Sequence, residues 1–188
     1  MAPSEILWRR LDVPGHDACR LEETAVGWRL AGMTVFLHES APAQLAYEVV
    51  CDRAWRTLQG HVRGWVGARA IDVSISRSPA GAWSRDGAAV PGLEGCEDLD
   101  FGFTPATNVF QLRRLALAPG QARDCPVAWL DDNARTLTLL PQRYERRSEL
   151  TYWYQSPTND YAALLELTPA GFARVYPGLW QQEDEGTS

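Results

Sequence analysis

The sequence contains no lysine, so all 18 of its basic side chains are arginines. With 24 acidic residues, the formal net charge is −6. Nucleic-acid-binding surfaces need a concentration of positive charge, and this balance therefore argues against a nucleic-acid partner. The exclusive use of arginine has two interpretations: a GC-rich genome, or the planar, bidentate recognition of phosphate or carboxylate groups that suits arginine better than lysine.

Long hydrophobic runs are also missing. No stretch approaches the roughly 18 apolar residues of a membrane-spanning helix, and Met1 to Arg10 has no apolar core of the length found in signal peptides. We therefore expect a cytoplasmic location and no stable membrane insertion.

The sequence lacks recognisable metal-binding and catalytic patterns. The four cysteines include no C-x-x-C pair, and none of the three histidines lies at a ligand spacing from a cysteine. We expect the cysteines to be reduced, small core residues, with no bound metal or other cofactor. G-x-S-x-G, H-E-x-x-H and glycine-rich phosphate loops are absent, which lowers the case for an enzyme.

What the sequence does contain is a period-2 alternation typical of β-strands. Ile71, Val73 and Ile75 alternate with polar residues, and turn sequences such as Asp86-Gly87 separate runs of this kind. Roughly ten to thirteen short strands follow. We predict an all-β fold, a single antiparallel β-barrel or half-barrel with an internal cavity, over residues 1–182, and a flexible acidic tail over 183–188.

Aromatic residues are abundant, with eight Trp, six Tyr and five Phe. A sheet folded over a cavity needs large, rigid walls, and Trp and Tyr combine an apolar face with a polar group that can bind a ligand. The alternative is that these side chains simply fill the core.

The densest unusual stretch runs from Gly95 to Leu115. Asp98 and Asp100 would share one face if they lie on a strand, where they could bind a hard cation or share a proton as acid and base. Alternatively, both are solvated or paired with Arg113 or Arg114. The residues from Thr104 to Asn108 are typical of a loop whose hydroxyl and amide groups satisfy the backbone.

Arg113 and Arg114 lie within a segment, Val109 to Leu117, that we predict to be a strand. Adjacent strand residues point to opposite faces, so one arginine faces inward and requires an anionic partner. We predict an inner Arg–Asp pair with Asp98 or Asp100, which would offer a polar head-group site at the cavity wall. The outer arginine would be solvated or bonded to the loop from Thr104 to Asn108.

These blocks, in their order and spacing, resemble the bacterial glycolipid-binding family, formerly a domain of unknown function. The resemblance extends from about Ile6 to Trp180 and is carried by Trp8, Cys19, Tyr47, Val49, Asp52, Trp55, Thr57, Gly81, Trp83, Gly95, Cys96, Asp98, Asp100, Thr104, Pro105, Thr107, Asn108, Arg113, Arg114, Leu115, Gln142, Tyr144, Tyr176, Pro177, Gly178 and Leu179. Ala106, where an aromatic residue is usual, departs from the family pattern and could widen a pocket or remove a ligand contact.

The resemblance implies a β-barrel-like fold similar to that of periplasmic lipoprotein carriers, with a cavity for a glycolipid or another lipid. We expect Trp55, Trp83, Tyr144 and Tyr176 to line one cavity. The full set of expected ligand-binding residues is Trp55, Trp83, Asp98, Asp100, Thr104, Thr107, Asn108, Arg113, Arg114, Tyr144 and Tyr176.

Three functions are compatible with these features. The first is a binding or carrier protein for a glycolipid or other amphiphilic small molecule. The second is a hydrolase-type enzyme acting on a sugar or phosphate ester, with Asp98 and Asp100 as acid, base or metal ligands and Arg113 or Arg114 holding an anion. The third is a scaffold that binds a partner protein through an exposed apolar patch.

The first function predicts that affinity rises with the length of the ligand's alkyl chain. Burial of each CH₂ group contributes roughly 0.8 kcal/mol before ordering costs. A calorimetric titration with alkyl glycosides of increasing chain length measures the dependence, and a series with constant affinity would contradict it.

Overall fold

The alternating residues of the first half form long antiparallel strands in the computed structural model, which describes residues 3–183. These strands are β1 (Ser4–Arg10), β2 (Gly15–Glu23), β3 (Gly27–His38), β4 (Ala41–Asp52), β5 (Thr57–Val66) and β6 (Arg69–Arg77). The alternation predicted around Ile71, Val73 and Ile75 is confirmed, because these three side chains are buried and the residues between them are exposed. Apart from Glu183, the predicted tail lies outside the described residues.

The second half of the chain forms shorter elements. They are β7 (Trp83–Arg85), β8 (Ala88–Val90), β9 (Leu99–Phe101), the helix α1 (Asn108–Leu115), β10 (Ala122–Asp124), β11 (Val127–Leu130), β12 (Leu137–Leu140), β13 (Arg143–Arg146), β14 (Thr151–Ser156), the 3-10 turn η1 (Pro157–Asn159), β15 (Tyr161–Leu167), β16 (Ala173–Tyr176) and β17 (Trp180–Gln182). The described residues therefore contain 17 strands, and the predicted ten to thirteen is too few. Strands of three or four residues are too short to show an alternation.

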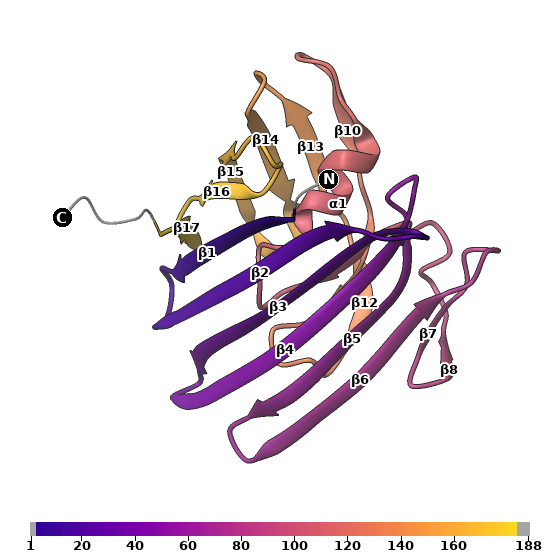
Figure 1. Ribbon diagram of the computed structural model, residues 1–188, viewed down its shortest axis with the longest axis vertical. Helices are drawn as coiled ribbons and strands as arrows, with labels where there is room; N and C mark the ends of the chain where they lie inside the picture. The colour runs from indigo at the N-terminus through magenta and orange to yellow at the C-terminus, as the bar shows by residue number, and fades with distance from the viewer. Residues whose placement is uncertain (1–2, 184–188) are drawn as a thin grey trace.

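Fourteen strands form one antiparallel sheet in the order β10-β13-β14-β15-β16-β17-β1-β2-β3-β4-β5-β6-β7-β8. The pairing of β1 with both β2 and β17 joins the two halves of the chain. The sheet curls but its end strands, β10 and β8, do not pair with each other (Figure 1). The all-β prediction is confirmed in its half-barrel form, and the sheet is not a closed barrel.

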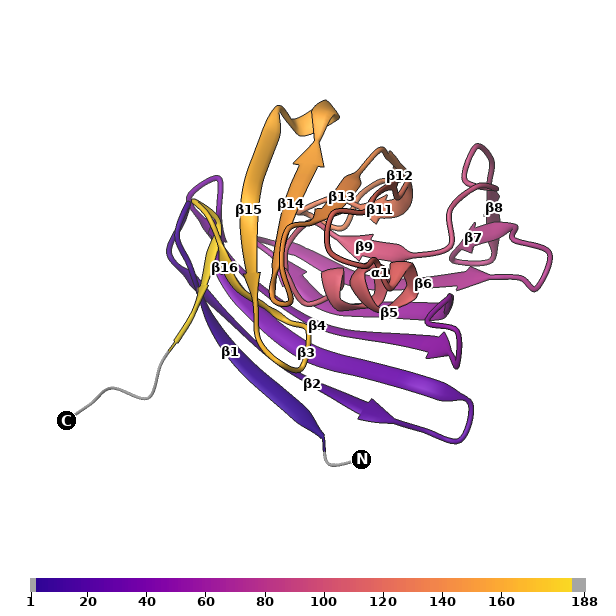
Figure 2. The ribbon, with the colours of Figure 1, turned by 90° about the horizontal axis from the view of Figure 1, so that it is seen from above.

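A second layer lies inside the curl of this sheet. It consists of a three-stranded sheet in the order β12-β11-β9, in which β9 runs parallel to β11, together with α1. Figure 2 shows β9, β11, β12 and α1 in the angle between the long strands β1–β6 and the wall formed by β14 and β15. An open sheet exposes its concave face, and this layer covers it.

The inner layer fills the concave face with aromatic side chains. Phe101, Phe103 and Phe110 are at most 1% exposed. A glycine in β5 permits the close approach of β9, since a Cβ atom at Gly60 would lie 2.2 Å from the side chain of Leu99. The core therefore continues without a gap from the long strands into the inner layer.

The predicted strand from Val109 to Leu117 is wrong, because residues Asn108–Leu115 form α1. The apolar residues of this short stretch fit both the two-residue repeat of a strand and the 3.6-residue repeat of a helix. Alternation alone therefore does not distinguish a strand from a helix here. The helix ends at Ala116 in the left-handed conformation, and its two arginines lie in the last turn, where they complement the helix dipole. None of the described helices is long and apolar enough to cross a membrane.

The predicted inward Arg–Asp pair is present, with Arg114 as its inner member. Its guanidinium group donates hydrogen bonds of 2.6 to 3.1 Å to both carboxylate oxygens of Asp98, which is fully buried, and a bond of 2.7 Å to Glu97. Arg113 is exposed and donates to the carbonyl of Ala170 rather than to the loop from Thr104 to Asn108. The pair anchors α1 to the strand that precedes it in sequence.

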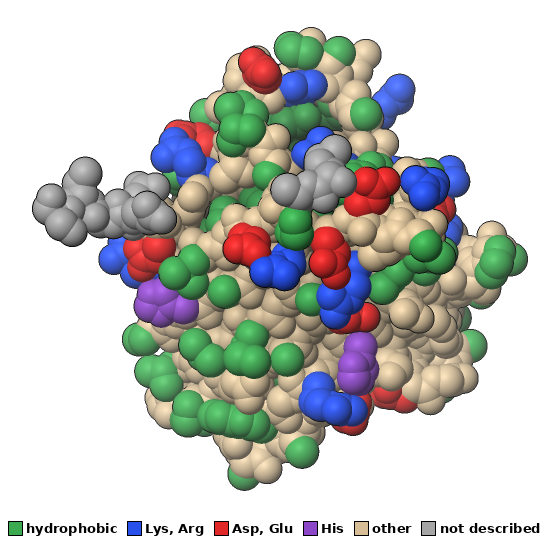
Figure 3. All heavy atoms as spheres, in the orientation of Figure 1, with side chains coloured by type: hydrophobic (Ala, Val, Ile, Leu, Met, Phe, Trp, Pro, Cys, Tyr) green, Lys and Arg blue, Asp and Glu red, His purple; other side chains and the backbone are tan. Residues whose placement is uncertain are grey.

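The outer face of the sheet carries several exposed apolar side chains. Figure 3 shows hydrophobic groups scattered over the long strands, between polar and backbone surface. The larger ones include Met33, Val35 and Leu37 of β3 and Trp65 of β5.

Replacing Arg114 by Met should destabilise the protein by about 3–5 kcal/mol, because it leaves the Asp98 carboxylate buried without a counter-ion. The matched variant Arg113→Met changes an exposed side chain and should cost less than about 1 kcal/mol. Urea unfolding at neutral pH measures both free energies. Equal costs for the two variants would contradict the structural role of the Arg114–Asp98 pair.

Candidate functional site

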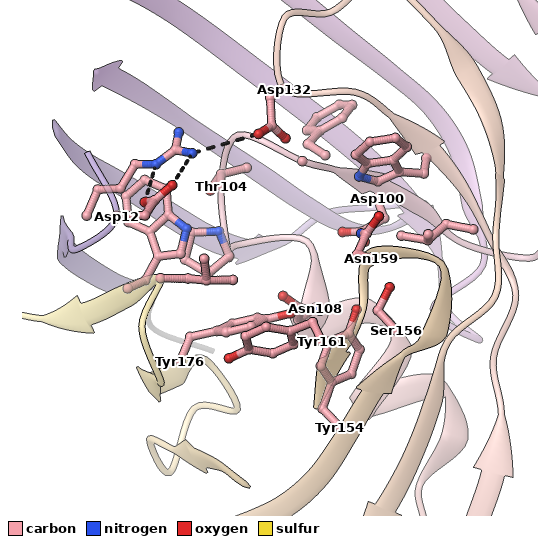
Figure 4. Close-up of a pocket in the computed structure, with 18 residues that line it drawn as sticks. Asp12, Asp100, Thr104, Asn108, Asp132, Tyr154, Ser156, Asn159, Tyr161 and Tyr176 are labelled. Atoms are coloured by element: carbon pink, nitrogen blue, oxygen red, sulfur yellow. Dashed lines mark hydrogen bonds and ion pairs between the residues drawn. The ribbon is translucent and has the colours of Figure 1, made fainter. Parts of the chain in front are cut away.

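A cavity of about 310 Å³ opens where the two halves of the sheet meet the inner layer. Its walls come from the end of β1, the segment that connects β9 to α1, β11 and β12, the β14–η1–β15 hairpin and the β16–β17 turn. Figure 4 shows Tyr154, Tyr161 and Tyr176 together on one side, with Asp12 and Asp132 across the cavity from them. The size is at the lower end of the range for small-molecule sites.

Asp100 of β9 supplies a buried carboxylate to this cavity. One of its oxygens accepts a hydrogen bond of 2.5 Å from the Thr107 hydroxyl, and the other accepts one of 2.7 Å from the Gln142 amide. Burial raises the pKa of Asp100 to about 6, and these two hydrogen bonds oppose the rise. Both of the hydrogen-bond donors are neutral, so the charge of the ionised carboxylate is not cancelled locally.

A hydrogen-bonded chain leads from the cavity into the core of the sheet. Thr104 lines the cavity, and its hydroxyl lies 3.1 Å from the hydroxyl of Tyr47, which donates a bond of 2.7 Å to Asp17. The other carboxylate oxygen of Asp17 is buried and has no hydrogen-bond partner among the described residues. Burial raises the pKa of Asp17 to about 7, although the hydrogen bond from Tyr47 lowers it.

Tyrosine rings form one wall of the cavity. Tyr154, Tyr161 and Tyr176 lie with their ring centroids 5.5 to 6.0 Å apart, and Tyr144 packs behind them at 5.0 Å from Tyr154. Asn108, the first residue of α1, donates a 2.8 Å hydrogen bond from its amide nitrogen to the Tyr144 hydroxyl. The faces of these tyrosine rings give the wall an apolar surface, and their hydroxyl groups give it polar edges.

The opposite wall holds Arg10, the only arginine among the described residues that line the cavity. Arg10 donates two hydrogen bonds of 2.8 and 3.0 Å to Asp12 and lies 3.8 Å from an oxygen of Asp132. Its guanidinium group also lies between two aromatic rings, 4.8 Å from the centroid of Phe36 and 5.3 Å from that of Trp180. Its orientation is therefore fixed by both ionic and cation–π contacts.

A second polar side chain of interest in the cavity wall is Ser156, at the end of β14. It is 1% exposed, its hydroxyl makes no hydrogen bond of normal geometry among the described residues, and only a weaker polar interaction links it to Tyr154. Buried hydroxyl groups almost always have a partner. This position is suited to a hydrogen bond with a bound molecule.

Four of the eleven predicted ligand-binding residues line the cavity: Asp100, Thr104, Asn108 and Tyr176. Two more lie directly behind it, since Thr107 bonds to Asp100 and Tyr144 bonds to Asn108. These six residues come from the blocks that connect β9 to α1 and that form β13 and β16. The structure therefore brings together about half of the predicted set.

The other five predicted residues lie elsewhere. Trp55, in the loop after β4, stacks on Trp28 of β3 with their ring centroids 4.2 Å apart. Trp83 of β7 is buried, and its indole N–H donates a hydrogen bond to the carbonyl of Cys96. The shared cavity predicted for Trp55, Trp83, Tyr144 and Tyr176 is thus wrong, and only Tyr176 lines the cavity found.

Asp98, Arg113 and Arg114 do not line the cavity either. The Arg–Asp pair was predicted to offer a head-group site at the cavity wall, and this part of the prediction is wrong. The reason is the helical conformation of α1, which directs Arg114 toward Asp98 immediately before β9 instead of across a hairpin. Asp98 and Asp100 consequently face different surroundings.

Sequence reasoning missed Arg10, Asp12, Trp129, Asp132, Tyr154, Ser156, Asn159, Tyr161 and Trp180. The alternation from Leu150 to Tyr154 indicates a strand with an aromatic face, and this signal could have identified Tyr154. The acidic residues at the rim carry no comparable signal, because they lie in turns after β1 and β11 whose positions depend on the fold of the whole chain. The described residues contain no group of three or more His, Cys, Asp or Glu side chains that could hold a metal ion.

An open β-sheet curled over a small, mixed polar and aromatic cavity is a half-barrel with the features of a small-molecule binding protein. The chain belongs to the family described as "Putative glycolipid-binding", whose model matches residues 5–182. Its structure is similar to the crystal structure of a DUF1089 family protein from Pseudomonas aeruginosa, with 27% sequence identity and a TM-score of 0.81 over 89% of this chain and 91% of that chain. No curated protein matches the chain in sequence.

The buried Asp17 predicts a specific pH dependence of stability. Its pKa is about 7 in the folded protein and near 3.8 in the unfolded chain, so the folded state holds the proton more tightly, and stability is lost as the pH rises toward and through 7. Asp17→Asn should therefore gain stability relative to the unmodified protein between pH 4 and 8, by roughly 4 kcal/mol at most.

Urea unfolding of both proteins across this pH range measures the difference. Asp124→Asn serves as the control, because Asp124 is a surface carboxylate whose side chain is 78% exposed. A difference between Asp17→Asn and the unmodified protein that stays constant with pH would show that Asp17 ionises normally.

Proposed function

We propose that this protein binds a glycolipid or a similar amphiphile and holds its polar head group in the cavity beside Asp100. Membership of the family supports a binding function, and the cavity supplies a place for it. In this proposal the protein acts in the cytoplasm as a carrier or binding module that shields the head group of its ligand.

The main support for the proposal is that a carboxylate, a hydroxyl group and aromatic rings all line one small cavity. The carboxylate of Asp100 accepts hydrogen bonds, the hydroxyl of Ser156 can donate or accept, and the rings of Tyr154 and Tyr176 present apolar faces. A sugar has the complementary chemistry, because its hydroxyl groups project from a ring whose C–H faces are apolar.

The structure also limits where the lipid chain can lie. The interior behind the cavity is filled by Phe101 and Phe103, which are 1% and 0% exposed, so a long alkyl chain has no space deeper in the fold. The chain would instead leave past the partly exposed side chains of Trp129 and Leu179, which line the cavity and contribute apolar surface. The half-barrel would then enclose the head group and only the first part of the chain.

The geometry does not favour the hydrolase alternative in the form considered from the sequence. Asp98 is held by Arg114 and does not line the cavity, whereas Asp100 does, so the two carboxylates do not face a common substrate. Arg113 is exposed outside the cavity and cannot hold an anion there.

The direct test is a titration of the protein with octyl β-D-glucoside and octyl β-D-galactoside below their micelle-forming concentrations. Calorimetry should show one ligand per chain, and native mass spectrometry should show the same stoichiometry. Asp100→Asn should weaken binding about tenfold or more, because a hydrogen bond to a charged acceptor contributes about 1.5–3 kcal/mol.

Asp124→Asn provides the matched control, since it removes the same charge from an exposed side chain that does not line the cavity. Near-ultraviolet circular dichroism checks that both variants keep the native packing. The proposal fails if neither glycoside saturates the protein, or if the two variants bind equally well.

A further inference from the structure

The charges that line the cavity are predominantly negative. The lining contains three carboxylates and one cationic side chain, which belong to Asp12, Asp100, Asp132 and Arg10. With all four ionised, the formal charge of the lining is −2, from three carboxylates and one guanidinium group. A fourth carboxylate, Asp17, lies behind Thr104 and is reached through the Tyr47 hydroxyl.

Arg10 is already committed to protein groups. Asp12 engages it through two hydrogen bonds, Asp132 approaches it to 3.8 Å, and Phe36 and Trp180 contact its guanidinium group. Its side chain is only 8% exposed, and one of its nitrogens, Nη1, is buried without a hydrogen-bond partner among the described residues. A second anion would have to compete with a bidentate carboxylate that is already in place.

Asp100 has no positive charge among its hydrogen-bond partners. Its two side-chain donors, Thr107 and Gln142, are neutral. An anionic head group placed beside it would bring two negative charges together in a space with little water, where charge repulsion is much stronger than in bulk solvent. A neutral hydroxyl group, in contrast, can donate a hydrogen bond to the same carboxylate.

Ser156 shows what kind of group the cavity accommodates. Its buried hydroxyl makes no hydrogen bond of normal geometry among the described residues, and it can donate to, or accept from, an uncharged hydroxyl group of a ligand. The cavity therefore offers a carboxylate acceptor, a hydroxyl and aromatic faces, and its lining arginine is already paired with Asp12 and lies close to Asp132. These groups match an uncharged polyhydroxyl ring.

We propose that the cavity selects amphiphiles with an uncharged, sugar-like head group and excludes those whose head group carries a phosphate, sulfate or carboxylate. This inference rests on the proposed function, because it specifies the ligand class of the same cavity. It is narrower than glycolipid binding, since many glycolipids are acidic.

The test uses pairs of ligands that differ only in one charge. Octyl β-D-glucoside is compared with octyl β-D-glucuronide, and octyl β-D-galactoside with octyl β-D-galacturonide, by calorimetry at pH 8. Each pair has the same ring and the same alkyl chain, but one member carries a carboxylate in place of a CH₂OH group. We expect the uncharged member of at least one pair to bind, and its uronide to bind at least tenfold more weakly.

Two variants separate a local effect from the overall charge of the protein. Asp100→Asn and Asp124→Asn each remove one negative charge, but only Asp100 lines the cavity. Asp100→Asn should reduce the preference for the uncharged ligand severalfold, whereas Asp124→Asn should leave this preference unchanged.

The possible results distinguish the two proposals. Equal or tighter binding of the uronides would overturn the charge selectivity while leaving glycoside binding intact. An equal loss of selectivity in both variants would assign it to net charge and also overturn the inference. If none of the four ligands binds, the proposed function itself fails, and the selectivity fails with it.

Discussion

The fold depends on one constraint: a long antiparallel sheet that curls without closing must cover its concave face. The inner layer, which includes the segment from β9 to α1, covers this face. Gly60 of β5 lets Leu99 of that layer approach the sheet closely enough to leave no gap. Because the inner layer is packed with phenylalanine, the interior is solid, and the candidate cavity lies where this layer meets the β14–η1–β15 hairpin. The position and the small size of the cavity follow from this packing.

Two buried acidic residues at the start of the inner layer, Asp98 and Asp100, have different surroundings. Asp98 is neutralised by Arg114, which fastens α1 in place, and the pair therefore serves the structure. Asp100, two residues later, is held only by neutral donors, and burial raises its pKa to about 6. A buried carboxylate without a counter-ion is costly to maintain, and such groups often mark functional positions. This contrast with Asp98, together with its position in the cavity wall, makes Asp100 the candidate centre of the site.

The sequence indicates the fold class well and the site only in part. Long strands such as β6 show clear alternation, and the turns at Gly81, Gly87, Gly120 and Gly171 all adopt the positive φ angles that glycine allows. The short stretch of α1 fits both periods, so its helix and the resulting path of Arg114 could not be read from alternation. Asp12 lies only two residues after Arg10, but Asp132 reaches Arg10 from the turn after β11, and only the packing of the inner layer against the sheet brings this residue to it.

The central claim is that the cavity beside Asp100 is the ligand site, and a crystal structure of the protein with an alkyl glycoside tests it most directly. We predict sugar density against the rings of Tyr154 and Tyr176, with hydroxyl groups within hydrogen-bonding distance of Asp100 and Ser156 and the alkyl chain leaving past Trp129 and Leu179. A glycoside bound instead on the outer face of the sheet, near Met33 and Trp65, with no ligand density in the cavity, would contradict it.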